Sequence, residues 1–300
     1  MGLVNAEAKI LLKECHKELE VDKCNCNGAK AIVIGTVDYY VDYKVLKKYG
    51  FTNKEEHEIH KKLPVNTNEW YNSNKKLCSN FFKHFGYDDY KEIDINERAD
   101  IKIDLNYPVS ENLKGQYDIV WDHGSVEHIM NICQAMNNLV DLVKVGGIIL
   151  HSQGTGDQTN AGYWTISPNY YLDFYKTNGF EIKKIILRDR RGHYVKYSEV
   201  KTKNSTIGSL IPFYLLPSFH LRLIRDDIVS GIFIKFPFLN YVYNGLNRRV
   251  PKIAGVINFI LGRSATGGAD WCIMVIAKKI KEISNKNYEI QNIYRSSKAI

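Results

Sequence analysis

The 300-residue sequence lacks a long apolar run, an early signal sequence and a paired CxxC motif, and it has only 7 prolines. Its apolar runs at 207–216, 228–239 and 256–261 are shorter than the ~20 residues that a membrane-spanning helix needs. The first residues show no basic start followed by an apolar stretch, which argues against a secretory signal peptide. We therefore expect a soluble, cytoplasmic protein.

Cysteine is also scarce, and none of it is arranged as a zinc site. The 6 cysteines are Cys15, Cys24, Cys26, Cys78, Cys133 and Cys272. Cys24 and Cys26 form a CxC pair without the second half that structural zinc sites use. His57 and His60 are three residues apart but have no evident third ligand. We predict reduced thiols and no metal site.

The excess of positive charge is modest. There are 41 lysines and arginines against 33 acidic residues, which gives a formal charge of +8. The lysines are spread along the chain, which favours a solvated basic surface, although an anionic partner such as nucleic acid or a membrane stays open. A hydrophobic content of 44% and a charged content of 25% are typical of globular proteins and exclude disordered and coiled-coil designs.

The most informative stretch runs from residue 117 to residue 151. An apolar alternation at 117–121 predicts a strand, helical spacing at 129–143 predicts a helix, and an apolar run at 148–150 predicts a second strand. Gly146 and Gly147 predict the turn between helix and strand. In a parallel βαβ unit, ligands bind beyond the carboxyl ends of the strands. This rule places Asp122, His123, Gly124 and His151 at the predicted site.

The rest of the chain predicts a doubly wound, mostly parallel α/β sheet of seven strands. Further strands are expected at 30–34, 90–95, 100–105, 180–187 and 271–277, and helices at 6–21, 41–49, 54–63, 74–84 and 167–178. The predicted units are an N-terminal helix (1–28), a cofactor-binding core (29–191), a mainly helical insertion (192–268), a last sheet strand (269–281) and a polar tail (282–300).

Residues 192–268 interrupt the sheet pattern. The segment contains Pro212, Pro217, Pro237 and Pro251, and several of its arginines and lysines lie near aromatic residues in the sequence. Two readings stay open, a lid over the acceptor site and a surface that contacts a membrane interface.

A nucleoside-binding sheet needs a tight turn after its first strand and an acidic residue after its second. Gly35 and Asp94 occupy these positions. A carboxylate can accept from both ribose hydroxyls, which explains an acidic residue there. Asp104, beside the backbone N–H of Leu105, is suited to hold adenine.

The runs ADIKIDLNYPV, YDIVWDHGSVEHI, LVKVGGIILH and YWTISPNYYLDFYKTNGFEI, in this order, resemble class I S-adenosylmethionine-dependent methyltransferases. Within them, the pattern is similar to a small-molecule, sugar-type branch. The resemblance covers residues 29–187, and 271–277 takes the place of the reversed last strand. The usual glycine-rich first loop is reduced here to VIGTVDYYVD, in which Gly35 is the one glycine.

The resemblance implies S-adenosylmethionine as cofactor. Asp94, with Ile95 beside it, would hold the ribose, and Asp104 with Leu105 would hold adenine. The methionine end would be bound by Gly35, the backbone of Thr36 and Val37, Asp38, Asp122, His123 and Gly124.

The implied reaction transfers a methyl group to a hydroxyl or amine of a small polar acceptor. The acceptor class that the resemblance favours is a sugar or nucleotide sugar of surface-glycan synthesis. A histidine is best matched to act as base near neutral pH. The candidates are His151, His128 and His123, in that order, and His128 forms an EH pair with Glu127. Two alternatives stay open: a non-catalytic methyltransferase-like module that binds a membrane or a partner, and an RNA methyltransferase, with nucleic acid the less favoured partner.

Overall fold

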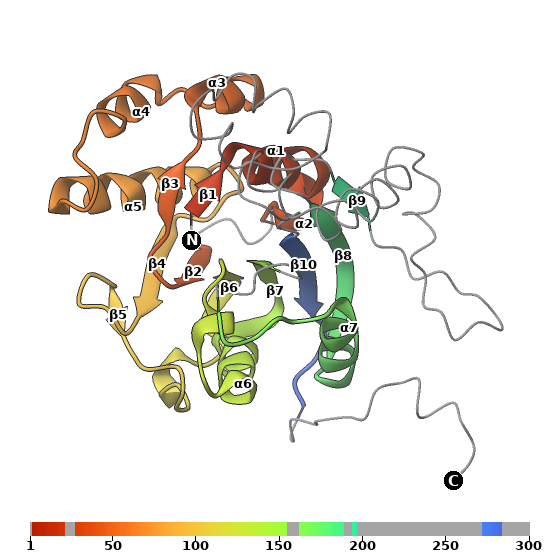
Figure 1. The fold of residues 1–300 in the computed structure, drawn as a ribbon. Coiled ribbons are helices and arrows are strands. Elements are labelled where there is room, and N and C mark those ends of the chain that lie inside the picture. The colour runs from red at the N-terminus through yellow and green to blue at the C-terminus, as the bar shows by residue number, and fades with distance from the viewer. Residues whose placement is uncertain (1, 22–27, 155–161, 189–193, 197–271, 284–300) are drawn as a thin grey trace, which may run out of the picture.

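In the computed structural model, a central sheet of eight strands has the order β5-β4-β2-β6-β7-β10-β8-β9 (Figure 1). The structure describes residues 2–21, 28–154, 162–188, 194–196 and 272–283. The strands are β2 (Lys30–Ile34), β4 (Asp89–Asp94), β5 (Ile101–Lys102), β6 (Tyr117–Asp122), β7 (Val143–Gly154), β8 (Phe180–Arg188), β9 (Tyr194–Lys196) and β10 (Cys272–Lys279). β2 is the first strand of this sheet along the chain and lies between β4 and β6. The next strands, β4 and β5, lie on one side of β2, and the later strands lie on the other side, so the strand order reverses at β2.

Most neighbouring strands are parallel, and β10 is the reversed strand. It pairs antiparallel with both β7 and β8, while β2, β4, β5, β6 and β7 pair in parallel. The predicted α/β sheet with a reversed last strand is therefore confirmed. β9 is an additional strand, antiparallel to β8, at the start of the segment predicted as an insertion.

Helices cover both faces of the sheet. Before β4 the chain forms β1 (Gly2–Val4), α1 (Asn5–Glu14), α2 (His16–Leu19), β3 (Asp38–Tyr40), α3 (Tyr43–Leu46), η2 (Lys47–Tyr49), α4 (Lys54–His60) and α5 (Asn68–Lys83). Later elements are η3 (Glu111–Leu113), η4 (Val126–His128), α6 (Ile132–Leu142) and α7 (Pro168–Thr177). β1 pairs in parallel with β3 to form a separate two-stranded sheet, which the sequence did not predict.

Alternation along the strands divides the core into two layers. On β2, Ala31 and Val33 pack with α1 and α5, whereas Ile32 and Ile34 pack with α6 and α7 on the other face. Successive strand residues point to opposite faces, and a strand covered on both sides must be apolar throughout. This requirement explains the uninterrupted apolar run AIVI at residues 31–34 of β2.

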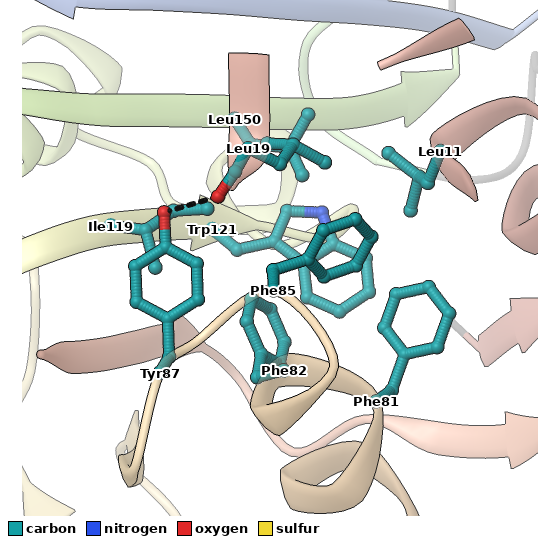
Figure 2. A pocket seen from close by; sticks show the side chains of 9 residues that line it. All are labelled: Leu11, Leu19, Phe81, Phe82, Phe85, Tyr87, Ile119, Trp121 and Leu150. Atoms are coloured by element: carbon teal, nitrogen blue, oxygen red, sulfur yellow. Dashed lines mark hydrogen bonds between the residues drawn. The ribbon is translucent and has the colours of Figure 1, made fainter. Parts of the chain in front are cut away.

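The layer that contains α1 and α5 is aromatic where it meets β6. Figure 2 shows Phe81, Phe82 and Phe85 around Trp121, with the ring centroids of Phe82 and Trp121 5.3 Å apart. The Tyr87 hydroxyl donates to the carbonyl oxygen of Leu19 at 2.8 Å (Figure 2). This hydrogen bond connects the N-terminal segment to the central sheet, so that segment is part of the core layer.

The predicted turn at Gly146 and Gly147 is wrong, because both glycines lie inside β7. Between the pairs Tyr117↔Val143 and Ile119↔Ile148 the register shifts, so β7 bulges against β6. Gly146 has a φ of +86°, and a Cβ on Gly147 would lie 2.8 Å from the backbone oxygen of Asp118. The glycines therefore permit a β-bulge where two strands approach closely.

Most of the predicted insertion (192–268) and of the polar tail (282–300) lies outside the described residues. So do Cys24, Cys26 and the prolines of the insertion. Within the part of the chain that the structure describes, no helix is both long and apolar enough to cross a membrane.

Candidate cofactor and active site

Gly35, the first residue after β2, lies where the carboxyl ends of β2, β4 and β6 meet. Its φ of +86° lies in the left-handed region, and its N–H donates to Ile93 O at 2.7 Å. A Cβ here would lie 2.5 Å from Ser125 Oγ, which itself donates to Ile34 O at 2.6 Å. The position therefore requires glycine, because the backbone turns sharply against the loop that follows β6.

Asp94 is the last residue of β4 and lies beside this turn. Its Oδ2 accepts from the Thr36 N–H at 3.1 Å, and its Oδ1 accepts from the Asn96 N–H at 3.2 Å. An ionised carboxylate has about four lone-pair positions, so it retains acceptors for a pair of hydroxyls. The next side chain, Ile95, is 65% exposed and offers an apolar surface. These residues fit the ribose and base of a nucleoside.

Asp104 and Leu105 follow β5 at the same edge of the sheet. Asp104 Oδ1 accepts from the backbone N–H and the side-chain Nδ2 of Asn106, at 2.9 and 2.8 Å. Leu105 is buried, and its carbonyl oxygen accepts from Asn138 Nδ2 at 3.0 Å. The turn is thus fixed by side-chain hydrogen bonds to Asp104 Oδ1, and Oδ2 can accept from a ligand, since none of the hydrogen bonds among the described residues uses it.

The loop residues predicted to hold the methionine end are largely bound to the protein itself. The Thr36 N–H is engaged by Asp94, and Val37 is buried. Asp38 begins β3 and accepts from the Tyr40 hydroxyl at 3.4 Å. Their contact with the methionine end stays a prediction.

Asp122, which is fully buried, is the centre of a hydrogen-bond network at the end of β6. Its Oδ1 accepts from the N–H groups of Ser125 and Val126, both at 3.1 Å. Its Oδ2 accepts from His151 Nδ1 at 2.8 Å and from Gln153 Nε2. These donors compensate for burying the carboxylate and fix the loop after β6.

His151, the first histidine candidate, is held at both ring nitrogens. Because Nδ1 donates to Asp122, Nε2 accepts from the hydroxyl of Tyr175. The side chain is 0% exposed. The structure therefore places His151 inside the network, and its role as base stays a prediction.

His123 belongs to a second buried polar cluster, on the α1 side of the sheet. Its Nε2 lies 3.1 Å from Glu7 Oε2, and Arg188 Nη2 donates to the same oxygen at 3.3 Å. Burial raises the pKa of Glu7, but His123 and then Arg188 outweigh this effect and lower it to about 2. His123 Nδ1 has no partner among the described residues. The neighbouring Gly124 is buried, with a φ of +69°.

Glu127 and His128, the EH pair after β6, both lie on η4 but differ in burial. His128, the remaining histidine candidate, is exposed, whereas Glu127 is only 3% exposed. Neither carboxyl oxygen of Glu127 has a hydrogen-bond partner among the described residues. Burial, and then the charge of Asp122, raise the pKa of Glu127 to about 8. A carboxyl with such a pKa beside a cofactor edge is a candidate functional group.

Several site residues were not predicted from the sequence, although part of the signal was present. Gln153 is two residues beyond His151 on β7, so strand periodicity puts both on one face. Tyr171 and Tyr175 are four residues apart on α7, and the Tyr171 hydroxyl donates to Gln153 Oε1. Glu7 gave no signal, because its partners are distant in the sequence.

In the described ranges, no group of three or more histidine, cysteine or acidic side chains is arranged to hold a metal ion. His57 and His60 are instead bound to neighbouring groups. His57 Nε2 is 3.1 Å from the Tyr39 hydroxyl, and His60 Nε2 is 3.0 Å from the Tyr39 carbonyl oxygen. These two histidines therefore help to fix β3 against α4.

No family model and no curated protein matches this sequence. Among solved structures, the chain is similar to phosphoethanolamine N-methyltransferase 2 of Haemonchus contortus in complex with S-adenosyl-L-methionine, at 13% identity over 91% of this chain and 56% of that chain (TM-score 0.38). It is also similar to coclaurine N-methyltransferase bound to N-methylheliamine and SAH, at 11% identity over 91% and 71% (TM-score 0.37). A third similar structure is the cyclase SpnF, at 12% identity over 91% and 81% (TM-score 0.36).

At these identities and TM-scores the similarities carry no argument about activity. The strand order, with β10 reversed between β7 and β8, shows a doubly wound, Rossmann-like sheet. In a doubly wound sheet, the ligand site lies where strand order reverses. Gly35 and Asp94 lie there, at the ends of β2 and β4.

Proposed function

We propose that this protein is an S-adenosylmethionine-dependent methyltransferase that acts on a hydroxyl or amine of a small polar molecule. The observation that carries the proposal is the contact between the loop after β2 and Asp94. There the Gly35 turn and the Thr36 N–H orient the carboxylate beside the exposed Ile95. The same edge contains Asp104 and the buried Asp122 network.

Bound S-adenosylmethionine supplies a methyl group already activated by a sulfonium, so the protein's main tasks are alignment and exclusion of water. Asp94 would accept from the ribose hydroxyls, and Asp104 would accept from the exocyclic amine of adenine. The network of Asp122, His151 and Gln153 keeps the loop after β6 in a single conformation. A rigid loop matters, because small displacements of the reacting groups lower the rate strongly.

The acceptor loses a proton as it gains the methyl group, and Glu127 is the best-suited group to take it. Its pKa of about 8 lies near the working pH, so a minor fraction is ionised at neutral pH, and this fraction is a stronger base than an ordinary carboxylate. Its oxygens are not used by other described residues. We expect Glu127→Gln to lower kcat at least tenfold, while cofactor affinity changes less than twofold.

The cofactor is tested by calorimetric titration of S-adenosylmethionine and S-adenosylhomocysteine into wild type, Asp94→Ala and Asp89→Ala. Asp89 is at the opposite end of β4, so its removal controls for changes to the strand itself. We expect binding to wild type and Asp89→Ala and at least a tenfold loss in Asp94→Ala. Absence of binding to folded wild type would contradict the proposal and favour a non-catalytic module.

The acceptor class is proposed more finely as a sugar or nucleotide sugar, on the sequence resemblance. A screen of sugars, nucleotide sugars, small amines and RNA with labelled cofactor tests it. Methylation of RNA alone would exclude a small-molecule acceptor.

Cytoplasmic location and peripheral membrane contact through residues 192–268 are also proposals. Liposome flotation of wild type against Arg248→Glu with Arg249→Glu tests the second. Unchanged flotation would remove an electrostatic membrane contact.

A further inference from the structure

A cavity of ≈ 240 Å³ lies between the α5 face of β4 and the loop that carries Arg98. Its walls include Thr36, Asn74, Glu92 and Arg98. Asp94 does not line it, whereas Thr36 and Val37, which belong to the loop predicted to hold the methionine end, do. The pocket therefore adjoins the cofactor edge at Thr36, whose N–H donates to Asp94, and extends from there toward α5 and Arg98.

Asn74 gives this pocket an unsatisfied buried donor. The residue is 2% exposed, and its Oδ1 accepts from the Tyr39 N–H at 2.8 Å. That bond fixes the orientation of the amide. Its Nδ2 then has no hydrogen-bond partner among the described residues. Leaving a buried donor unpaired is unfavourable, and a ligand acceptor would remove that penalty.

Two cationic side chains lie at the same pocket. The guanidinium of Arg98 lies 4.1 Å from the ring centroid of Tyr71, so an aromatic face supports it. Lys75 also lines the cavity and forms an ion pair with Asp100. Arg98 forms no ion pair with another described residue and retains its planar set of donors, which suits oxyanions.

Glu92 is the one carboxylic acid of the pocket wall, and its charge is reduced. It is 4% exposed, and its Oε1 accepts from the Tyr90 hydroxyl at 2.8 Å. Burial raises its pKa to about 7. Near neutral pH this carboxyl is partly protonated, so its repulsion of an anion is weakened.

We propose that this pocket binds the anionic group of a small ligand, a phosphate monoester or a carboxylate, between Asn74 Nδ2 and the Arg98 guanidinium. The cavity is larger than a bare oxyanion requires, so the ligand includes a few carbon atoms as well. This site goes beyond the proposed methyl transfer and does not depend on it.

The test is calorimetric titration of glycerol 3-phosphate, inorganic phosphate and acetate into four proteins at constant ionic strength. The proteins are wild type, Asn74→Asp, Arg98→Gln and Lys102→Gln. Asn74→Asp keeps an oxygen acceptor for the Tyr39 N–H but replaces the donor with a second oxygen. Lys102→Gln removes a charge near the same loop, from a side chain that does not line the cavity and pairs with Glu97.

We expect saturable one-to-one binding by wild type and Lys102→Gln, and at least tenfold weaker binding by Arg98→Gln and Asn74→Asp. Tighter binding of glycerol 3-phosphate than of acetate identifies a phosphate site, and the reverse order identifies a carboxylate site. Arg98 is exposed, so that variant is expected to fold even if Asn74→Asp does not. No saturable binding of any probe by wild type, or equal losses in Arg98→Gln and Lys102→Gln, would overturn the proposal.

Discussion

Replacing Glu127 with glutamine should change how the stability of the protein depends on pH. The folded-state pKa of Glu127 is about 8, against an ordinary value of 4.5. The folded protein therefore binds a proton at this carboxyl between these pH values, where the unfolded chain has released it. Stability contributed by the protonated carboxyl is present below pH 4.5 and is lost as pH rises toward 8.

The size of this effect follows from the two pKa values. At 1.36 kcal/mol for each pKa unit, the difference between 4.5 and about 8 amounts to about 5 kcal/mol. About 4 kcal/mol of it falls between pH 5 and pH 9. Glutamine has nearly the same shape and does not titrate, so this part of the pH dependence disappears from Glu127→Gln.

The measurement is urea unfolding of wild type, Glu127→Gln and Glu97→Gln at several pH values from 5 to 9. We expect Glu127→Gln to gain stability relative to wild type as pH rises, and the gain to level off above pH 8. Glu97 is exposed on the loop after β4, and its variant should parallel wild type. Other titrating groups, such as Glu92, cancel in each difference. A difference between Glu127→Gln and wild type that does not change with pH would refute the reasoning.

Three further changes test the packing and charge of the site. Gly35→Ala should lower the free energy of unfolding more than Gly50→Ala does. Both glycines have a positive φ, which costs about 1–2 kcal/mol for alanine, but of the two only Gly35 has another atom where the new Cβ would lie. Equal losses in urea unfolding would contradict this. Phe82→Ala should lose about 3–5 kcal/mol in the same assay, and a loss below 1 kcal/mol would contradict the packing in Figure 2. In wild type, the ionised Glu7 contributes about 3 kcal/mol of stability above pH 4.5, and this contribution is lost as pH falls toward 2. Glu7→Gln should lack this pH-dependent contribution. Parallel stability curves for the two proteins between pH 3 and 6 would count against it.

The sequence was informative wherever one short segment sets its own conformation. The KAIVI run predicted β2 with both of its ends, because a strand covered on both faces must be apolar throughout. α7 was predicted to within a residue, since Ser167 caps it and Pro168 occupies its first turn. Asp94 was correctly placed at the end of β4, because the alternation stops there.

The sequence was less informative where two segments interact. Gly146 and Gly147 predict a turn when the chain is considered alone. Only the pairing of β7 with β6 shows that they accommodate a bulge. β1 and β3 were missed for the same reason, since three-residue strands have too few residues to show a period and form because they pair with each other.

The sequence by itself determined the α/β class and the edge where the polar residues gather, because periodicity and glycine position are local properties; the reversed last strand was implied only by the family resemblance. Tertiary structure alone decided the charge and hydrogen bonding of those residues. His151 is buried and hydrogen-bonded to Asp122 and Tyr175, and Glu127 is a buried carboxyl with a pKa of about 8. Burial and distant partners set proton affinity, and both depend on chain segments that meet only in the folded protein.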